Sequence, residues 1–196
     1  MKLLVKVKLE SKLSSKIKKI GILGGTFDPA HKGHLKISKE AKKRFNLNNI
    51  IWAITKKNPF KKKSNLDLNS RIKFAKKITK KNKFIKIQFY EEKIRSNKTI
   101  DLINYLKKSN KKLDIYFIMG ADNLIYFIMG ADNLINFHKW HKWKLISQKC
   151  NILVFDRQGY KAKSLKSVTF KRLNQKILKF IKFKKVNISS SQLRKI

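Results

Sequence analysis

The sequence is poor in residues that stabilise secreted scaffolds: it has one cysteine, two prolines and eleven acidic residues among 196. Cys150 cannot pair within the chain, which excludes an internal disulfide framework and favours a reducing cytoplasm. The longest uncharged apolar run, residues 124–131, is far shorter than the roughly 18 residues that cross a bilayer, so we expect no membrane span. Lys6 and Lys8 interrupt the apolar amino end, so we also expect no export signal.

Positive charge is abundant, since 50 lysines and arginines give a net charge of +39. The chain is nevertheless 42% hydrophobic and 11% aromatic, which favours a globular core over a disordered polybasic tail. Only six of the basic residues are arginines, whereas proteins that read nucleic acids favour arginine at bases and phosphates. We therefore expect weak attraction to polyanions but no specific nucleic-acid partner.

Short apolar runs alternate with amphipathic stretches of helix length, a pattern typical of an α/β domain. We predict a single doubly wound, mostly parallel sheet of Rossmann-like type over residues 16–196, preceded by an N-terminal extension of residues 1–15. The predicted strands are 17–24, 50–55, 84–89, 115–119, 151–156 and 179–188. The predicted helices are 34–46, 68–80 with Asp67 or Asn69 as its cap, 99–108 and 137–148. In such folds ligands bind beyond the carboxyl ends of the strands.

A ten-residue segment, IYFIMGADNL, occurs twice in tandem, at residues 115–124 and 125–134. Repeat folds use longer periods and more copies, so we interpret this as a recent duplication or an assembly error. One sheet position accepts one copy, and the other copy leaves an apolar segment in a connection. We expect the second copy to take the functional place, because it keeps its spacing to residues 136–143.

The segment GGTFDPAHKGH, residues 24–34, lies where the first predicted strand passes into the first helix. Glycines let a phosphate approach the backbone closely, and a helix N-terminus offers free N–H groups. His31 and His34 would then donate hydrogen bonds to phosphoryl oxygens. One alternative is an ordinary Gly-Gly turn followed by two histidines without a functional role. A metal site formed by the two histidines is not favoured, because no further ligands lie nearby in the sequence. The spacing of a P-loop is absent. The whole string at this junction favours a phosphate site.

This segment resembles the His-x-Gly-His signature of the nucleotidylyltransferase superfamily, and its sequence is similar to that of bacterial nicotinate-nucleotide adenylyltransferases. The resemblance extends over residues 19–194. It implies transfer of the adenylyl group of ATP to nicotinate mononucleotide, giving deamido-NAD and pyrophosphate in NAD biosynthesis, with Mg²⁺ carried by ATP. The turn residues that it assigns to ATP are Gly24, Gly25, Thr26, Phe27, His31 and His34.

Further segments resemble the same family. In residues 58–61 the resemblance points to Lys61 near the phosphates; as bare sequence it belongs to a basic run. Gly130-Ala131-Asp132 matches a turn whose acidic residue lies near the adenosine ribose, and residues 120–122 match equally well. The residues assigned to the nicotinate nucleotide are Lys61, Thr99, Asp101, Trp140 and Arg157. For Trp140 a buried helix face shared with Trp143 is the alternative to stacking on the pyridine ring.

Residues 188–194, ISSSQLR, resemble the family's terminal Ile-Ser-Ser-Thr-x-x-Arg motif. The resemblance implies that Ser189, Ser190, Ser191 and Arg194 bind ATP, and that this string meets the turn around Thr26 on one triphosphate. Hydroxyls that open a helix can also simply cap it. The chain stops two residues after Arg194, where relatives usually continue into a longer helix, so the packing of this motif and an oligomer interface are left open. A homo-oligomer is one of the open alternatives.

The implied reaction needs no general base, because a phosphate monoester with a second pKa of about 6 is largely dianionic at neutral pH. Catalysis then consists of holding two polyanions in line and neutralising charge. The residues implied in this role are His31, His34, Lys61 and Arg194. The alternatives are phosphopantetheine adenylyltransferase, which usually has threonine in place of His31, and a basic nucleic-acid-binding protein. The preference for the acid or the amide pyridine nucleotide stays open.

Overall fold

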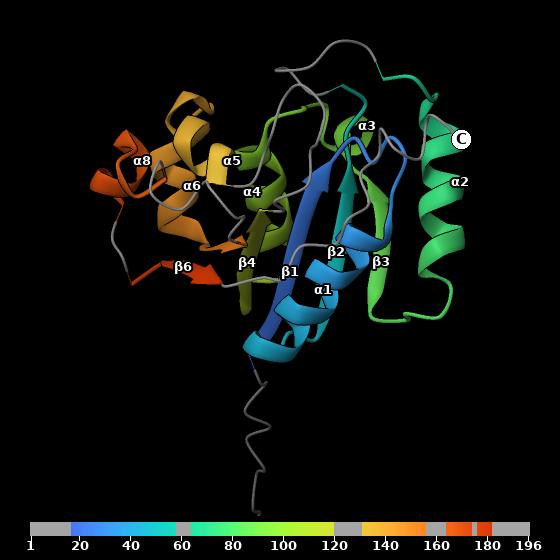
Figure 1. Cartoon of the computed structure of the whole chain (residues 1–196), viewed down its shortest axis with the longest axis horizontal. Coiled ribbons are helices and arrows are strands. Elements are labelled where there is room, and N and C mark those ends of the chain that lie inside the picture. The colour runs from blue at the N-terminus through green and yellow to red at the C-terminus, as the bar shows by residue number, and fades with distance from the viewer. Residues whose placement is uncertain (1–16, 58–63, 120–130, 156–163, 174–175, 182–196) are drawn as a thin grey trace, which may run out of the picture.

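The described part of the chain forms a six-stranded, entirely parallel sheet in the order β3-β2-β1-β4-β5-β6, with helices on both faces (Figure 1). The computed structural model describes residues 17–57, 64–119, 131–155, 164–173 and 176–181. The strands are β1 (Lys18–Gly25), β2 (Asn49–Ile54), β3 (Ile85–Phe89), β4 (Leu113–Met119), β5 (Asn151–Phe155) and β6 (Leu178–Ile181). The strand order reverses direction between β1 and β4, which places a ligand crevice beyond their carboxyl ends. The predicted fold class is confirmed.

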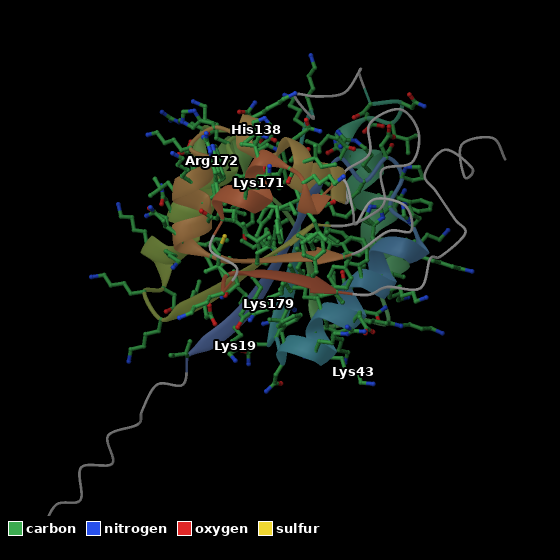
Figure 2. The ribbon with its side chains drawn as sticks, turned by 60° about the vertical axis from the view of Figure 1, so that its left-hand side comes forward. Lys19, Lys43, His138, Lys171, Arg172 and Lys179 are labelled. Atoms are coloured by element: carbon green, nitrogen blue, oxygen red, sulfur yellow. The ribbon has the colours of Figure 1, made fainter. Side chains whose placement is uncertain are left out.

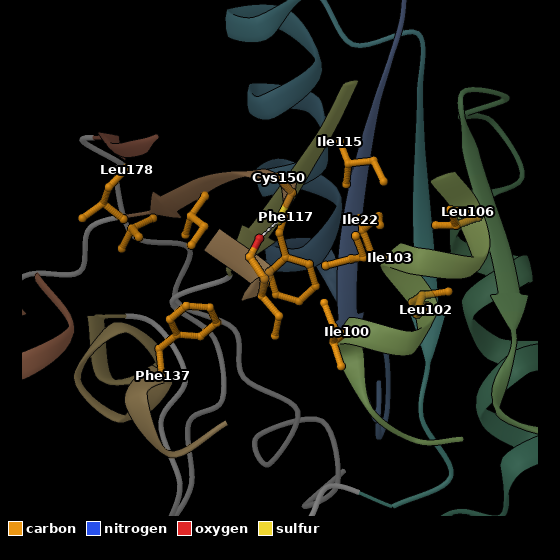
Figure 3. Packing of buried hydrophobic residues seen from close by; sticks show 14 of the residues in the cluster. Ile22, Ile100, Leu102, Ile103, Leu106, Ile115, Phe117, Phe137, Cys150 and Leu178 are labelled. Carbon is orange, nitrogen blue, oxygen red and sulfur yellow. Dashed lines mark hydrogen bonds between the residues drawn. The ribbon is translucent and has the colours of Figure 1, made fainter. Parts of the chain in front are cut away.

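The helices divide between the two faces of the sheet. They are α1 (Lys32–Phe45), α2 (Leu68–Thr79), α3 (Glu91–Ile94), α4 (Thr99–Ser109), α5 (Ala131–Asn136), η1 (Phe137–Lys139), α6 (Trp143–Lys149) and α8 (Val168–Arg172). Helices α1 and α2 share one apolar cluster with β1, β2 and β3. Helices α4, α5 and α6 share a second cluster with β1, β4 and β5, part of which Figure 3 shows around Phe117. We call these the α1–α2 face and the α4–α8 face.

Strand β1 is apolar because it is covered on both sides, as is usual for a central parallel strand. Ile20 and Ile22 point into the cluster of the α4–α8 face, whereas Leu23 belongs to the cluster of the α1–α2 face. Gly21 leaves the room that this packing needs: a Cβ there would lie 2.7 Å from Ile118 Cδ1 and 3.0 Å from Leu47 Cδ1. The first strand is therefore anchored tightly below the turn that follows it.

The predicted strands are all confirmed, although residues beyond 181 lie outside the described part of the sixth. The helices predicted at 34–46, 68–80 and 99–108 correspond to α1, α2 and α4, and Asp67 caps α2 by accepting from Ser70 N at 2.9 Å. The single helix predicted over 137–148 is wrong. The chain forms η1, turns through Lys142 at φ 51 and begins α6 at Trp143. Helices α3, α5 and α8 were not predicted.

The duplicated segment is divided between a strand and a helix. Ile115 to Met119 of the first copy lie in β4 and pair with β1 and β5, whereas Ala131 to Leu134 of the second copy begin α5. The expectation that the second copy takes the functional place is therefore wrong for the strand. Leu113 and Asp114 favour the first copy there: they extend the pairing with β1, and Asp114 accepts a hydrogen bond from Asn151 at 3.0 Å.

Basic side chains project from both faces and from the strand ends, as Lys43, Lys171 and Lys179 illustrate in Figure 2. Within the described residues the one ion pair joins Arg44 to Glu40 on α1. No helix in this part of the chain is both long and apolar enough to span a membrane.

Candidate active site

A tightly packed turn links the carboxyl end of β1 to α1. The strand ends at Gly25, and His31 is the N-cap of α1. Thr26 and Phe27 are both buried within this turn. The turn therefore places the N-terminus of a 14-residue helix at the carboxyl edge of the sheet, where a parallel α/β fold binds anions.

His31 and His34 form a reciprocal cap at this helix N-terminus. The Nδ1 atom of His31 accepts from Gly33 N at 3.1 Å, and the Nδ1 atom of His34 accepts from His31 N at 3.1 Å. The two rings lie 3.9 Å apart, centre to centre. Because Nδ1 is the acceptor in both rings, each neutral imidazole carries its proton on Nε2. Each ring thus presents an N–H donor, as a phosphate oxygen requires.

Burial lowers the pKa of His31 to about 4. The desolvated site disfavours the charged imidazolium, and the positive end of the helix dipole acts in the same direction. At neutral pH His31 is therefore a neutral hydrogen-bond donor and does not supply a proton.

Aromatic packing holds the turn in an uncommon backbone conformation. Phe27 has φ 48, in the left-handed region that a bulky residue seldom adopts. Its ring stacks on Trp52 of β2 at 4.9 Å and lies 4.8 Å from the ring of His34. Trp52 in turn donates from Nε1 to Ser38 Oγ at 2.8 Å. The Phe27 side chain is buried in this aromatic packing, and its part in ATP binding stays a prediction.

Arg71 of α2 is a buried part of the site that sequence reasoning missed. Its guanidinium donates to four backbone carbonyls: Thr26 O at 2.6 Å, Thr55 O at 2.8 Å, and Lys56 O and Leu66 O at 3.1 Å each. The signal available in the sequence was its place on the apolar stripe of α2, where a charged residue needs partners.

Asp28 ties the other side of the turn to the segment before α2. Its carboxylate accepts from Asn65 N at 2.8 Å and from Leu66 N at 3.0 Å. Arg71 and Asp28 together fasten the turn to the carboxyl end of β2 and to the start of α2.

An open pocket of about 460 Å³ lies at the same edge of the sheet, between the ends of β2 and β3 and the start of α4. Its lining residues are Lys56, Phe89, Glu91, Glu92, Arg95, Ser96, Asn97 and Lys98. The predicted Thr99 and Asp101 open α4 beside it, and Asp101 Oδ2 accepts from Ser96 Oγ at 2.6 Å. Burial raises the pKa of Glu91, whose Oε2 accepts from Lys56 N at 3.1 Å.

Comparisons with known proteins agree with this geometry. The model of the cytidylyltransferase-like family matches residues 22–196. A probable nicotinate-nucleotide adenylyltransferase of Pelagibacter ubique strain HTCC1062 is 70% identical over 190 residues, 97% of this chain and 99% of the relative. The chain belongs to the nicotinate-nucleotide adenylyltransferases.

A second relative and a solved structure extend the comparison. The relative, from Clostridium botulinum strain Eklund 17B, is 34% identical over 184 residues, 91% of this chain and 86% of the relative. The solved structure of Plasmodium falciparum nicotinic acid mononucleotide adenylyltransferase complexed with NaAD matches with a TM-score of 0.67 at 20% identity, over 91% of this chain and 83% of that one. At that identity the structural match shows the fold.

Trp140, which the family resemblance assigns to the nicotinate ring, lies on the α4–α8 face. Its half-buried indole meets Phe117 edge-on at 5.9 Å and lies 5.4 Å from Phe137. Among the described residues its buried Nε1 has no hydrogen-bond partner. Trp143, the neighbouring tryptophan, also packs on Phe137, at 6.0 Å. Both tryptophans thus pack in the core, as the alternative interpretation of this segment expects. Contact between Trp140 and the nicotinate ring stays a prediction.

The structure brings together the adenylyltransferase residues of the first turn, and it places Thr99 and Asp101 at the same edge of the sheet. Asp132 lies in α5, and the structure describes its backbone but not its side chain. The other predicted site residues lie outside the described part: Lys61, Arg157, Ser189, Ser190, Ser191 and Arg194. Their meeting with the turn around Thr26 stays a prediction.

Proposed function

We propose that this chain transfers the adenylyl group of ATP to nicotinate mononucleotide, giving deamido-NAD and pyrophosphate as a cytoplasmic step of NAD biosynthesis. The observation that carries the proposal is the reciprocal cap of α1, in which the Nδ1 atoms of His31 and His34 each accept a backbone N–H and so orient both rings at the helix N-terminus. The 70% identical relative has the corresponding name.

The turn after β1 suits the triphosphate of ATP. The N-terminus of α1 supplies the positive end of its dipole, while the N–H groups of His31, Gly33 and His34 donate within the cap itself. The Nε2–H donors of His31 and His34 add hydrogen bonds that strengthen as charge gathers on the pentacoordinate α-phosphorus. Gly24 and Gly25 bring the backbone close without side chains in the way, and Ser189, Ser190, Ser191, Arg194 and Asp132 are proposed to complete the ATP site.

The pocket beside α4 suits the acceptor nucleotide. Lys56, Arg95 and Lys98 give its lining a net positive charge against Glu91 and Glu92. The N-terminus of α4 has no side-chain cap, so its first N–H groups suit the carboxylate of a pyridine nucleotide. Thr99 supplies that backbone, while Asp101 N donates to Lys98 O at 3.1 Å, so the Asp101 part in this site is proposed as support of the helix start. Lys61, Trp140 and Arg157 are proposed as further contacts.

The reaction is an in-line displacement at the α-phosphorus of ATP. An oxygen of the acceptor's phosphate forms the new bond, the bond to the bridging oxygen of pyrophosphate breaks, and its electron pair leaves with pyrophosphate. No proton transfer is required, since the attacking monoester is a dianion. The protein therefore acts by position and by charge, through His31, His34, Lys61 and Arg194.

Magnesium enters this proposal with ATP. Phosphate oxygens and water are the ligands that Mg²⁺ prefers, with one or two carboxylates from a protein. Within the described ranges no group of three His, Cys, Asp or Glu side chains could hold a metal ion. When bound there, it would neutralise charge on the leaving pyrophosphate.

The test is an acceptor series with purified protein, ATP and Mg²⁺, in which pyrophosphate release is followed. We expect release with nicotinate mononucleotide. Pyrophosphate release with phosphopantetheine alone would indicate a phosphopantetheine adenylyltransferase. No release with any acceptor, together with tight, salt-sensitive DNA binding, would indicate a nucleic-acid-binding protein. A parallel reaction with the amide nucleotide measures the acid preference.

Two tryptophan variants test the pyridine contact. Trp140→Phe should raise KM for nicotinate mononucleotide by up to about fivefold, since stacking on an indole contributes roughly 1 kcal/mol, whereas Trp143→Phe should leave KM near its original value. Equal effects of the two substitutions would assign Trp140 to core packing.

A further inference from the structure

We propose that Arg71 is a positioning residue whose buried guanidinium holds the phosphate turn and the acceptor pocket at a fixed distance from each other. The inference rests on the proposed function, because it concerns the alignment of the two substrates. Arg71 lies on α2 and is 2% exposed. It is not among the residues that line the acceptor pocket.

The first half of this link is the phosphate turn. Arg71 Nη1 donates to both Thr26 O and Thr55 O, so a single nitrogen joins the carboxyl ends of β1 and β2. The Thr26–Phe27 peptide is trans, and its carbonyl and N–H point to opposite sides. The bond to Arg71 therefore directs the Phe27 N–H away from α2 and sets the orientation of the turn.

The second half is the acceptor pocket. Arg71 Nη2 donates to Lys56 O at 3.1 Å, while Lys56 N donates to Glu91 Oε2 at 3.1 Å. The Lys56 backbone is thus held by a cation on its carbonyl and by a carboxylate on its N–H. Lys56 and Glu91 both line the pocket, so Arg71 is one residue removed from it.

The charge of Arg71 supports the same role. Within the described residues its guanidinium makes no ion pair and donates to carbonyls, although Asp28, Asp67 and Glu91 attract it from a distance. A buried cation costs free energy, and that cost falls when a polyanion binds nearby. The planar fork also reaches several carbonyls at once, which a lysine ammonium on a flexible stem does not.

Loss of this link should act on turnover more than on binding. Each substrate keeps the groups that touch it, but the distance and angle between the acceptor phosphate and the α-phosphorus are no longer held. Small errors in that geometry are costly in rate, because an in-line attack needs the reacting atoms at about 3–3.5 Å. The expected signature is a fall in kcat with both KM values nearly unchanged.

The experiment compares Arg71→Lys and Arg71→Met with Lys73→Met, an exposed site on the same helix. Each variant is assayed at a temperature where circular dichroism shows it to be folded. We expect kcat to fall about 100-fold in both Arg71 variants, with KM for each substrate within about threefold, and Lys73→Met to match the unchanged chain. A kcat within threefold, or a rise in one KM alone, would overturn the inference.

Substitution of Glu91 is the second part of the test. It tests the link through Lys56 even if neither Arg71 variant folds. Glu91→Ala leaves Lys56 N without its partner and should lower kcat about tenfold; because Glu91 also lines the acceptor pocket, kcat is the readout of this arm. The double variant Arg71→Lys with Glu91→Ala should lose little more than Arg71→Lys alone, since both act through Lys56. Multiplied losses, or a normal kcat in Glu91→Ala, would contradict the link.

The unchanged chain is assayed first with ATP and nicotinate mononucleotide. If no pyrophosphate is released at that stage, the proposed function is rejected. An active chain whose Arg71 and Glu91 variants keep normal turnover rejects the positioning role alone.

Discussion

The two faces of the sheet differ in what their buried polar groups do. On the α1–α2 face Arg71 reaches Thr26 across 45 positions of the sequence, and Trp52 reaches Ser38 across 14. On the α4–α8 face Ser147, Ser167 and Cys150 donate to carbonyls three or four residues earlier. Each face has one exception: Thr79 of α2 donates locally to Ala75 O, and Thr169 of α8 accepts from His138 N across 31 positions.

This difference separates a face that holds a site from a face that mainly supplies core. A buried hydrogen bond between distant segments fixes their relative position, whereas a bond within one helical turn only satisfies a local donor. The proposed phosphate site lies where the long-range bonds are concentrated. Removal of a polar group should therefore cost activity on the α1–α2 face, and changes in apolar packing should cost stability on either face.

The largest expected effect is that of His34→Ala, which removes an Nε2–H donor from the proposed phosphate site. We expect kcat to fall about 100-fold or more, with smaller changes in KM, because the lost bond strengthens in the transition state. Loss of the cap on His31 N should also lower the free energy of unfolding by about 1 kcal/mol. The exposed His141→Ala is the control, and a normal kcat in His34→Ala would remove that histidine from the mechanism.

The second prediction concerns pH and His31. Its pKa is about 4 in the folded chain, against a reference value of 6.5, so the unfolded chain takes up a proton first as pH falls. The stability contributed by the neutral ring is present above pH 6.5 and is lost as pH falls towards 4, about 3 kcal/mol in total. Urea unfolding at pH 7.5 and at pH 4.5 measures it.

A matched pair gives that pH experiment its control. His31→Gln should lose less stability between the two pH values than the unchanged chain, while His141→Gln should behave as the unchanged chain does. Equal losses in all three proteins would show that His31 keeps an ordinary pKa.

Gly21→Ala tests packing alone on the α1–α2 face. The added methyl would lie 2.7 Å from Ile118 Cδ1, closer than side chains approach, and should lower the free energy of unfolding by about 2 kcal/mol. The kcat of the folded protein should stay unchanged, since Gly21 lies below the turn. Gly24→Ala is the control for stability, because its methyl would meet Phe117 at an ordinary 3.8 Å. A large fall in kcat with stability intact would contradict the division of roles.

The smallest effect is expected from removal of one copy of the duplicated segment. Deleting residues 120–129 joins Met119 to Gly130 and keeps all the residues seen in β4 and α5. The free energy of unfolding should change by no more than about 2 kcal/mol, because the connection shortens from eleven residues to one, between three and four halvings at about 0.6 kcal/mol each. Thermal unfolding and kcat measure this, and loss of the fold would show that the extra ten residues are needed.

Local patterns predicted the first part of the molecule well. The turn after β1 and the start of α1 both lie within residues 24–34, so one continuous string contains the relevant signal, although the helix predicted from His34 begins at Lys32 and its cap at His31 was not predicted. Helix 137–148 failed for a different reason. The amphipathic spacing continues past Trp140, but the backbone turns at Lys142 so that η1 and α6 can each pack on the sheet.

The residues missed at the site, Arg71 and Trp52, are defined by distant partners. An arginine on an apolar helix stripe is visible in the sequence, but its four carbonyl acceptors come from three separate segments. The stacking of Phe27 on Trp52 likewise joins a turn to a neighbouring strand.

The sequence by itself determined the α/β class, the order of the strands along the chain and the histidine pair at the start of α1, because each depends on side-chain periodicity or on a short contiguous string. Only the tertiary structure decided which copy of the duplicated segment enters the sheet, how Arg71 joins β1 to β2, and that His31 is neutral. These properties arise from burial and from contacts between segments that lie far apart along the chain, and such contacts exist only once the sheet has formed.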